Sequence, residues 1–309
     1  MQVWSPFHRW VVTGAVMALL LAVPVGGILW LSVEPNKPDK PGPPAPPAEV
    51  VYQETLAAVD SNLGPLFAKL GQAGQPLAVK QSSLAAAEAT RAAGEKLAGV
   101  TPPGPVAEAH KQFTEGLAQL AGDLSTVATS PICANSAGVV ALSRAASAEQ
   151  IRTASAALRT VDPSRGYVVG GFLPEKVTPP AARPANGTVL KPAAKPGTRV
   201  LEVRNGGTED LMVLLAAEDP KVATAGVFVQ AGASAKIEKL PFGTYRMFLA
   251  SGTDWDEAGA GFTSNCRLWK FEKAQELTAN GGNRSVRVPP TAQPGTELAT
   301  VGVEDFPVR

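Results

Sequence analysis

The stretch at residues 197–204, GTRVLEVR, is where the chain changes from helical to strand periodicity. Leu201 and Val203 alternate here with Glu202 and Arg204, which is typical of a half-buried β-strand. Short apolar runs follow, separated by turn sequences such as NGG at 205–207, SG at 251–252 and NGGN at 280–283. This spacing predicts an antiparallel β-sandwich over residues 197–309. We expect further strands near residues 211–215, 227–229, 235–237, 244–249, 267–271 and 285–288.

Residues 49–161, upstream of this point, are rich in Ala and Leu at helical spacing. One apolar stripe consists of Val106, Phe113, Leu117, Leu120, Leu124 and Val127, and another of Leu56, Val59, Leu63, Leu66 and Leu70. Two more helices are predicted at about 77–97 and 148–161, the latter with Ser147 as its N-cap. Four such segments indicate an antiparallel helical bundle. A coiled-coil oligomer is the alternative for the segment that begins at Val106.

Pro-rich segments at residues 34–48 and 162–196 flank the helical region and are interpreted as linkers. Half of residues 35–48 are proline, so this segment should extend as polyproline II over roughly 40 Å. A spacer is favoured over the alternative, an SH3-type ligand. The predicted fold class is therefore α+β and multidomain, with an N-terminal transmembrane helix, a helical bundle and a C-terminal antiparallel β-sandwich.

The predicted membrane segment is residues 11–33, which carry no charged side chain. At ~1.5 Å per residue they span about 35 Å, enough to cross a ~30 Å hydrocarbon core. Trp10 and Trp30 stand where an aromatic belt would lie. We expect an uncleaved signal anchor in the cell membrane, with residues 1–10 in the cytoplasm and the bulk of the chain outside it. The alternative is a signal peptide cleaved near Gly26 or Gly27.

The composition excludes several classes of function. Lys and Arg number 28 against 27 Asp and Glu, a net charge of +1, which argues against a nucleic-acid binder. Two His and two Cys are too few for an iron–sulfur cluster or a Cys/His zinc site. His110 is expected on the surface, and the sequence has no Gly-x-Ser-x-Gly elbow and no phosphate-binding glycine loop. We therefore expect no cofactor, no metal and no catalytic residue.

The strongest polar cluster is TDWDE at residues 253–257. Trp255, placed in a turn among acidic residues, is expected to be exposed and to bind a sugar or a protein partner. Asp254, Asp256 and Glu257 could contribute to ligand binding, chelate Ca²⁺ or act as an acid/base pair. The alternative is that these carboxylates bond the backbone amides of their own turn.

Cys133 and Cys266 are the two cysteines of the chain. In an exported protein they allow one intramolecular disulfide, which would tie the helical region to the sandwich. The alternative is two buried or free thiols.

Several short motifs resemble those of uncharacterised exported or membrane-anchored bacterial proteins that combine a helical region with a C-terminal β-domain. They are PFGTY at 241–245, GTDWD at 252–256, FTSNC at 262–266, Phe271 and EDFP at 304–307, with the Cys133 segment and YVVGGF at 167–172 in the helical half. The resemblance implies a bacterial surface protein and brings no established activity or catalytic residue with it.

The predicted function is a non-enzymatic binding or scaffold module of the cell envelope, whose partners are the membrane through residues 11–33 and an envelope protein or glycan. The alternative is an enzyme that acts on envelope polysaccharide through Asp254, Asp256 or Glu257. A transmembrane sensor is a third hypothesis. The N-terminal side of the membrane segment argues against it, because it is too short to signal by itself.

Overall fold

The computed structural model describes residues 46–161, 163, 165–178, 183–290 and 297–308. The predicted transmembrane segment 11–33, the tail 1–10 and most of the linker 34–48 lie outside the described residues. Within the described part, no helix combines the length and the apolar character needed to cross a bilayer.

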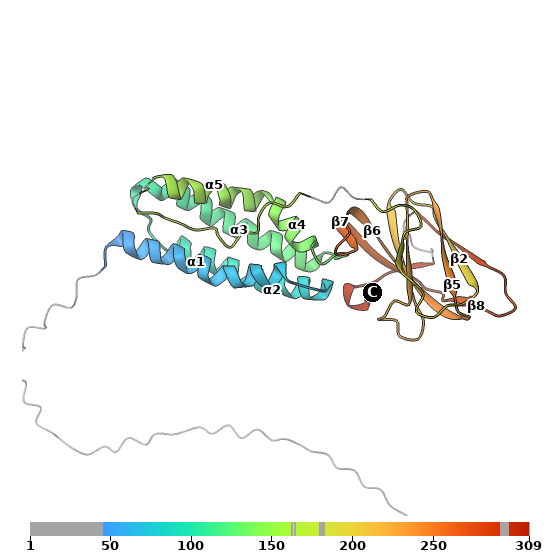
Figure 1. Cartoon of the computed structure of the whole chain (residues 1–309). Coiled ribbons are helices and arrows are strands. Elements are labelled where there is room, and N and C mark those ends of the chain that lie inside the picture. Colours follow the sequence, from blue (N-terminus) through green and yellow to red (C-terminus); the bar gives the residue numbers. More distant parts are fainter. Residues whose placement is uncertain (1–45, 162, 164, 179–182, 291–296, 309) are drawn as a thin grey trace, which may run out of the picture. The chain divides into compact units, whose positions relative to one another are not determined.

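The first half of the described chain is helical, as predicted, and forms a bundle (Figure 1). The α-helices are α1 (Ala48–Gly71), α2 (Pro76–Ala98), α3 (Ala107–Thr129), α4 (Ala137–Arg144) and α5 (Ala146–Val161). A 3₁₀ turn, η1 (Gly104–Val106), leads into α3. The sequence pattern missed α4, because eight residues are too few to show a clear helical repeat.

Apolar side chains at helical spacing fill the bundle core. Phe113, Leu117, Leu120 and Leu124 of α3 are fully buried, as their spacing predicted. On α1 the buried stripe includes Phe67, whereas Leu66 is only partly buried. Since each large side chain stabilises the fold by ~1.5–3 kcal/mol when it is buried, these stripes determine which helix faces meet.

Ser147 does not cap a helix, which corrects the prediction. It lies inside the first turn of α5, and its hydroxyl donates to a carboxylate oxygen of Asp123 in α3 at 2.5 Å. Gln150, three residues on, donates from its side-chain amide to the backbone oxygen of Gln112 at 3.0 Å. Both side chains therefore join α5 to α3.

The start of the segment predicted as a linker packs along α1. Tyr167, Val169 and Phe172 are buried in the bundle core, and the rings of Tyr167 and Tyr52 meet edge to face with centroids 5.3 Å apart. The backbone amide of Gly170 donates to Asp60 at 2.8 Å. Residues 165–173 thus complete the bundle as an extended strap.

The second half of the described chain consists of β-strands, which confirms the predicted α+β class (Figure 1). The strands are β1 (Val189–Lys191), β2 (Arg199–Asn205), β3 (Asp210–Ala216), β4 (Ala225–Val229), β5 (Ser234–Leu240), β6 (Gly243–Asp256), β7 (Gly261–Phe271), β8 (Gln275–Leu277), β9 (Arg284–Val288) and β10 (Leu298–Thr300). A larger sheet has the order β1-β4-β3-β6-β7-β10, with β8 paired to β6, and a smaller one has the order β5-β2-β9. Within the described residues the strands pair antiparallel, except β2 with β9, which run parallel.

The two sheets share a hydrophobic core. Leu201 and Ile237 of the smaller sheet belong to the same buried cluster as Val213, Leu249 and Trp269 of the larger one. A second cluster covers the opposite face of the larger sheet. Strand β3 is buried on both faces for this reason, and its sequence is a continuous apolar run.

The β6–β7 hairpin is longer than its neighbours. Strand β3 pairs with β6 only as far as Gly252, whereas the pairing of β6 with β7 continues to Asp256 and Gly261. The predicted turn at 251–252 therefore lies inside a strand, which corrects that boundary. A register shift follows Ser251, and Asn265 adopts a positive φ of 53° there, as expected at a β-bulge. The tip of the hairpin, residues 253–264, extends beyond the end of β3.

Candidate functional site

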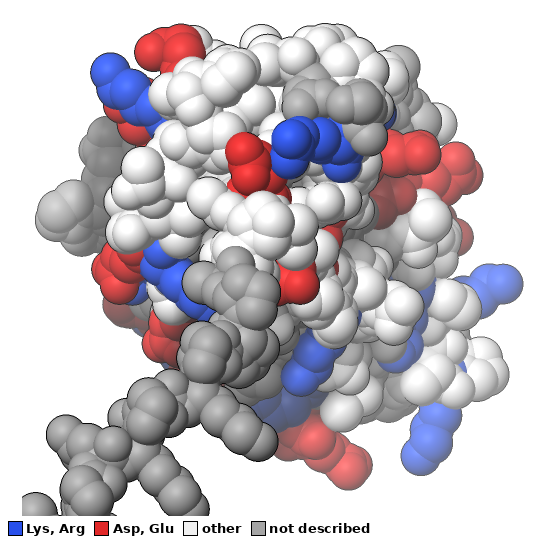
Figure 2. Space-filling view, turned by 90° about the vertical axis from the view of Figure 1, so that its left-hand side faces the viewer, with Lys and Arg blue, Asp and Glu red and all other residues white. Residues whose placement is uncertain are grey.

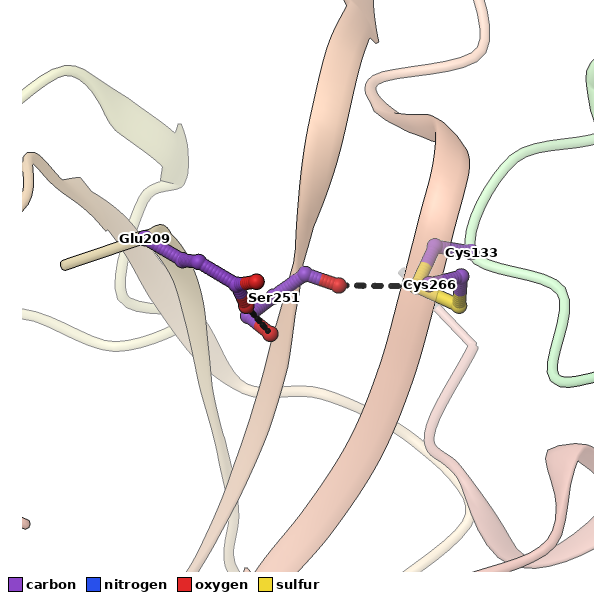
Figure 3. The surroundings of a disulfide bond; sticks show 4 residues. All are labelled: Cys133, Glu209, Ser251 and Cys266. Atoms are coloured by element: carbon purple, nitrogen blue, oxygen red, sulfur yellow. Dashed lines mark hydrogen bonds between the residues drawn. A yellow bond between two sulfur atoms is a disulfide. The ribbon is translucent and has the colours of Figure 1, made fainter. Parts of the chain in front are cut away.

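The predicted site residues Asp256, Cys133 and Cys266 lie where the hairpin tip meets residues 132–136, in the loop that joins α3 to α4. We call this region the joint. Its covalent element is a disulfide between Cys133, which precedes α4, and Cys266 on β7, with Cα atoms 5.6 Å apart (Figure 3). The predicted pairing is therefore confirmed. It joins residues 133 positions apart in the chain.

The backbones at the joint approach closely at Gly261. A Cβ atom added to this glycine would overlap the carbonyl oxygen of Cys133 and contact the Cα atom of Ala134 at 3.2 Å. Only glycine allows the hairpin to lie this near the loop before α4 without a shift of one backbone.

Asp256 bonds across the joint. Its Oδ2 accepts a hydrogen bond of 2.5 Å from the hydroxyl of Ser136, which stands just before α4. Its Oδ1 accepts the backbone amide of Ala258 at 3.0 Å, within the turn of the hairpin. The expectation that a carboxylate here bonds its own turn thus holds for one oxygen, while the other reaches the helical part.

Asp254 is also engaged by neighbouring side chains. Its Oδ2 accepts the hydroxyl of Ser264 at 2.8 Å, and Arg144 at the end of α4 lies 3.8 Å from the same oxygen. The Arg144 and Asp254 side chains are 47% and 36% exposed, so solvent screens this ion pair. Asp254 itself has a φ of 57°, in the left-handed region that Asp adopts more readily than most residues.

Trp255 is buried, which corrects the predicted exposure. Only 4% of its surface is accessible, and its ring meets Phe228 and Phe262 edge to face with centroids 5.0 and 5.1 Å apart. The physical reason is the length of β6: Trp255 lies on a strand that packs against β7 rather than in a turn. Glu257 is exposed, and its side chain makes no hydrogen bond or ion pair with the described residues.

A second polar group lies on the strands beside the disulfide (Figure 3). The hydroxyl of Ser251 donates to Glu209 at 2.7 Å, and Arg267 donates to the other oxygen of Glu209 at 2.6 Å. The Sγ atom of Cys133 lies 3.8 Å from the carbonyl oxygen of Ser251. Because a disulfide sulfur carries no proton, this is a van der Waals contact rather than a hydrogen bond.

Sequence reasoning missed Ser136, Arg144, Glu209 and Arg267. None of them belongs to a motif, and each reaches its partner only through the fold. The one available signal was the pair of cysteines, which pointed to contact between the segment around residue 133 and β7.

The joint also borders a cavity of about 390 Å³. Ile132, Met212 and Phe306 contribute apolar walls, and Asn135 and Lys221 contribute polar groups. Both polar groups have partners: Asn135 donates to the carbonyl oxygen of Gly74 at 2.7 Å, and Lys221 donates to Asp305 at 2.7 Å.

In the described part of the chain, no group of three or more His, Cys, Asp or Glu side chains could hold a metal ion. The joint thus holds the two halves together, and its polar side chains named here, apart from Glu257, are bonded to other groups of the protein.

His110 is buried, which corrects the expected surface position. It is 7% exposed, and its Nδ1 lies 3.2 Å from the hydroxyl of Tyr52. Burial lowers the pKa of His110 below its usual 6.5 because the charged form loses hydration. Helix α3 contacts both α2 and α5, so its buried face is wider than its apolar stripe.

Charge is dispersed on the face of the molecule shown in Figure 2, which views it from the side on which α1 begins in Figure 1. Acidic and basic side chains are interspersed there among uncharged ones. This face therefore presents no extended area of a single sign.

No family model, curated protein or solved structure matches this chain. The resemblance to exported bacterial proteins accordingly stays a prediction.

Proposed function

We propose that this chain is a membrane-anchored, extracytoplasmic binding or scaffold module of the cell envelope, without enzymatic activity. Residues 11–33 would hold it in the membrane as a single transmembrane helix, and residues 34–48 would space the described part from the lipid. The two-sheet domain, the sandwich of the predicted fold, would present the binding surface to an envelope protein or glycan.

The observation that carries this proposal is the Cys133–Cys266 disulfide. Disulfides form and persist in oxidising compartments and are rare in the cytosol. A disulfide between the helical part and β7 of the two-sheet domain also suits a scaffold, because it limits movement of one part relative to the other.

The contacts of the acidic residues favour a structural role over catalysis. A general acid or base must be within reach of its substrate. Asp256 is engaged by Ser136 and Ala258, and Asp254 by Ser264 and Arg144. An envelope polysaccharide enzyme that used Asp254 or Asp256 would have to break these contacts first. Glu257 is exposed and needs no such change, but glycoside hydrolysis generally uses a pair of carboxyl groups.

Protease treatment of whole cells combined with thiol labelling tests the proposal. We expect the full chain to fractionate with membranes, protease added outside the cells to degrade its C-terminal part, and a maleimide reagent to label neither cysteine before reduction. A Cys133→Ser chain, which leaves Cys266 unpaired, is the control for labelling. Recovery of the chain in the soluble cytosolic fraction, with both thiols labelled, would contradict the proposal.

A further inference from the structure

A cavity in the two-sheet domain lies at the opposite end of β6 from the joint. It has a volume of about 740 Å³, within the range of ~300–1,000 Å³ that is usual for ligand sites. Its walls are the loop after β3, the turn before β6 and the connection from β1 to β2. The lining residues used below are Lys195, Glu218, Asp219, Phe242 and Tyr245.

Phe242 is an exposed aromatic ring that is held in place. It is 54% exposed, and the guanidinium of Arg199 lies 5.0 Å from the ring centroid, so the cation supports the ring by a cation–π contact. Arg199 in turn donates to the carbonyl oxygen of Ala279. The hydroxyl of Tyr245 donates to the carbonyl oxygen of Pro241 at 3.0 Å and fixes the turn that carries Phe242. A ring fixed in this way loses little conformational entropy when a ligand stacks on it.

Charged residues line the same cavity as this ring. The side chains of Lys195 and Glu218 are exposed and make no hydrogen bond or ion pair with the described residues. The Oδ1 atom of Asp219 accepts the backbone amide of Lys221 at 2.8 Å, and no bond within the described part of the chain uses its other oxygen. The cavity therefore combines one exposed aromatic ring with hydrogen-bond acceptors and one donor. This combination is typical of a site for a polar ligand.

We infer that this cavity binds one sugar ring of an envelope polysaccharide, stacked on Phe242 and hydrogen-bonded to Glu218, Asp219 and Lys195. A sugar ring has a face of C–H groups that fits an aromatic ring and a rim of hydroxyls that fits carboxylates and an ammonium. The inference rests on the proposed function and deepens it by naming the ligand class and a site distinct from residues 254–257.

A proline-rich peptide fits the cavity less well. Such peptides dock in grooves lined by several exposed aromatic rings. Among the described lining residues Phe242 is the one exposed ring, because Tyr245 is 4% exposed and its hydroxyl is bonded to Pro241.

Co-sedimentation with purified peptidoglycan tests the inference, using the full chain in a mild non-ionic detergent. We expect the wild-type chain to sediment with peptidoglycan and a β-1,4-linked N-acetylglucosamine tetramer to release it. Phe242→Ala should weaken retention about tenfold or more, and Glu218→Gln should weaken it by a smaller factor. Release by the tetramer assigns the binding to the glycan rather than to the peptide stems.

Two matched variants control for surface changes elsewhere. Leu84→Ala removes an apolar side chain of almost the same exposure, 53% against 54% for Phe242, but on α2. Glu257→Gln removes an exposed carboxylate at the hairpin tip. Both should be retained as well as the wild-type chain, and unchanged thermal midpoints would show that all four variants are folded.

Equal retention of Phe242→Ala and the wild-type chain would overturn the inference, as would release by a peptide of residues 35–48 instead of the tetramer. Failure of the wild-type chain to sediment, while it still fractionates with membranes and captures an envelope protein, would overturn the glycan site and leave the proposed function standing. Recovery of the chain in the cytosol would contradict both.

Discussion

Gly261 lies directly against the carbonyl group of Cys133, so the hairpin tip of the two-sheet domain and the segment before α4 meet backbone to backbone. The same hairpin carries Asp256, which accepts a hydrogen bond from Ser136 three residues beyond Cys133. One side of the joint is therefore a strand pair, and the other is a short stretch of the helical half.

Gly261→Ala should destabilise the fold by about 1–3 kcal/mol, because the added methyl group forces one backbone away from the other. Urea unfolding of both proteins measures this difference. Gly282→Ala is the matched control in the same domain, since nothing lies within 4 Å of a Cβ at that position, and it should change the free energy of unfolding by less than about 0.5 kcal/mol. Equal effects of the two substitutions would show that the approach at Gly261 is not constrained.

The disulfide should contribute strongly to the free energy of unfolding. A closed loop with a separation of 133 residues gives about 5 kcal/mol in the chain-entropy model, and removal of a native disulfide typically costs about 2–5 kcal/mol. The Cys133→Ser/Cys266→Ser chain should show a loss in this range by urea unfolding. Reductant should lower the stability of the wild-type chain and leave the double variant unchanged; a double variant as stable as the oxidised wild type would contradict the prediction.

Local pattern was enough to predict the helices and most of the strands. The stripe on α3 and the alternation along β2 are properties of short segments, and both appear as buried faces. The disulfide was predictable from chemistry, because the chain has two cysteines and one way to pair them.

The predicted exposure of Trp255 and His110 was wrong because the burial of each depends on residues distant in the sequence. Gly252 looked like part of a turn, but a Cβ there would lie 2.6 Å from the Cβ of Phe262, so this glycine permits close strand packing. Once β6 continues through Gly252, Trp255 falls on a strand and is buried. His110 is buried because a neighbouring helix supplies Tyr52, which no spacing within α3 could indicate.

Trp255→Ala should cost about 3–5 kcal/mol of stability, because it leaves a cavity between Phe228 and Phe262. Thermal or urea unfolding of the variant checks this, with Trp255→Phe as a milder change that keeps an aromatic ring. Phe242→Ala is the exposed counterpart and should cost less than about 1 kcal/mol, mainly through its contact with Arg199. If Trp255→Ala instead kept full stability and lost binding to envelope material, Trp255 would be a ligand residue after all.

Ser136 and Asp256 should be energetically coupled across the joint. A hydrogen bond to a charged group contributes about 1.5–3 kcal/mol, and the separate effects of Ser136→Ala and Asp256→Asn should therefore exceed that of the double variant when summed. Unfolding free energies of the four proteins give the coupling directly. Additive effects would mean that the two side chains act independently, and a hydrolytic activity on wall polysaccharide that disappears in Asp256→Asn would favour the enzymatic alternative.

The stability of the helical part should fall as the pH drops below about 6.5, the pKa of histidine in the unfolded chain. Burial lowers the pKa of His110 in the folded state, so the unfolded chain binds this proton first. The loss should have a slope of up to about 1.4 kcal/mol per pH unit until the pH reaches the folded-state pKa, below which it should level off. His110→Gln keeps a group that can bond the Tyr52 hydroxyl but does not titrate. As the pH falls from 7.5 to 5.5, the wild-type chain should therefore lose more of its free energy of unfolding than the variant does. His8 lies outside the described residues and is common to both proteins, so it cancels in this difference. Parallel pH profiles would show that His110 can take up a proton without disturbing its contact with Tyr52.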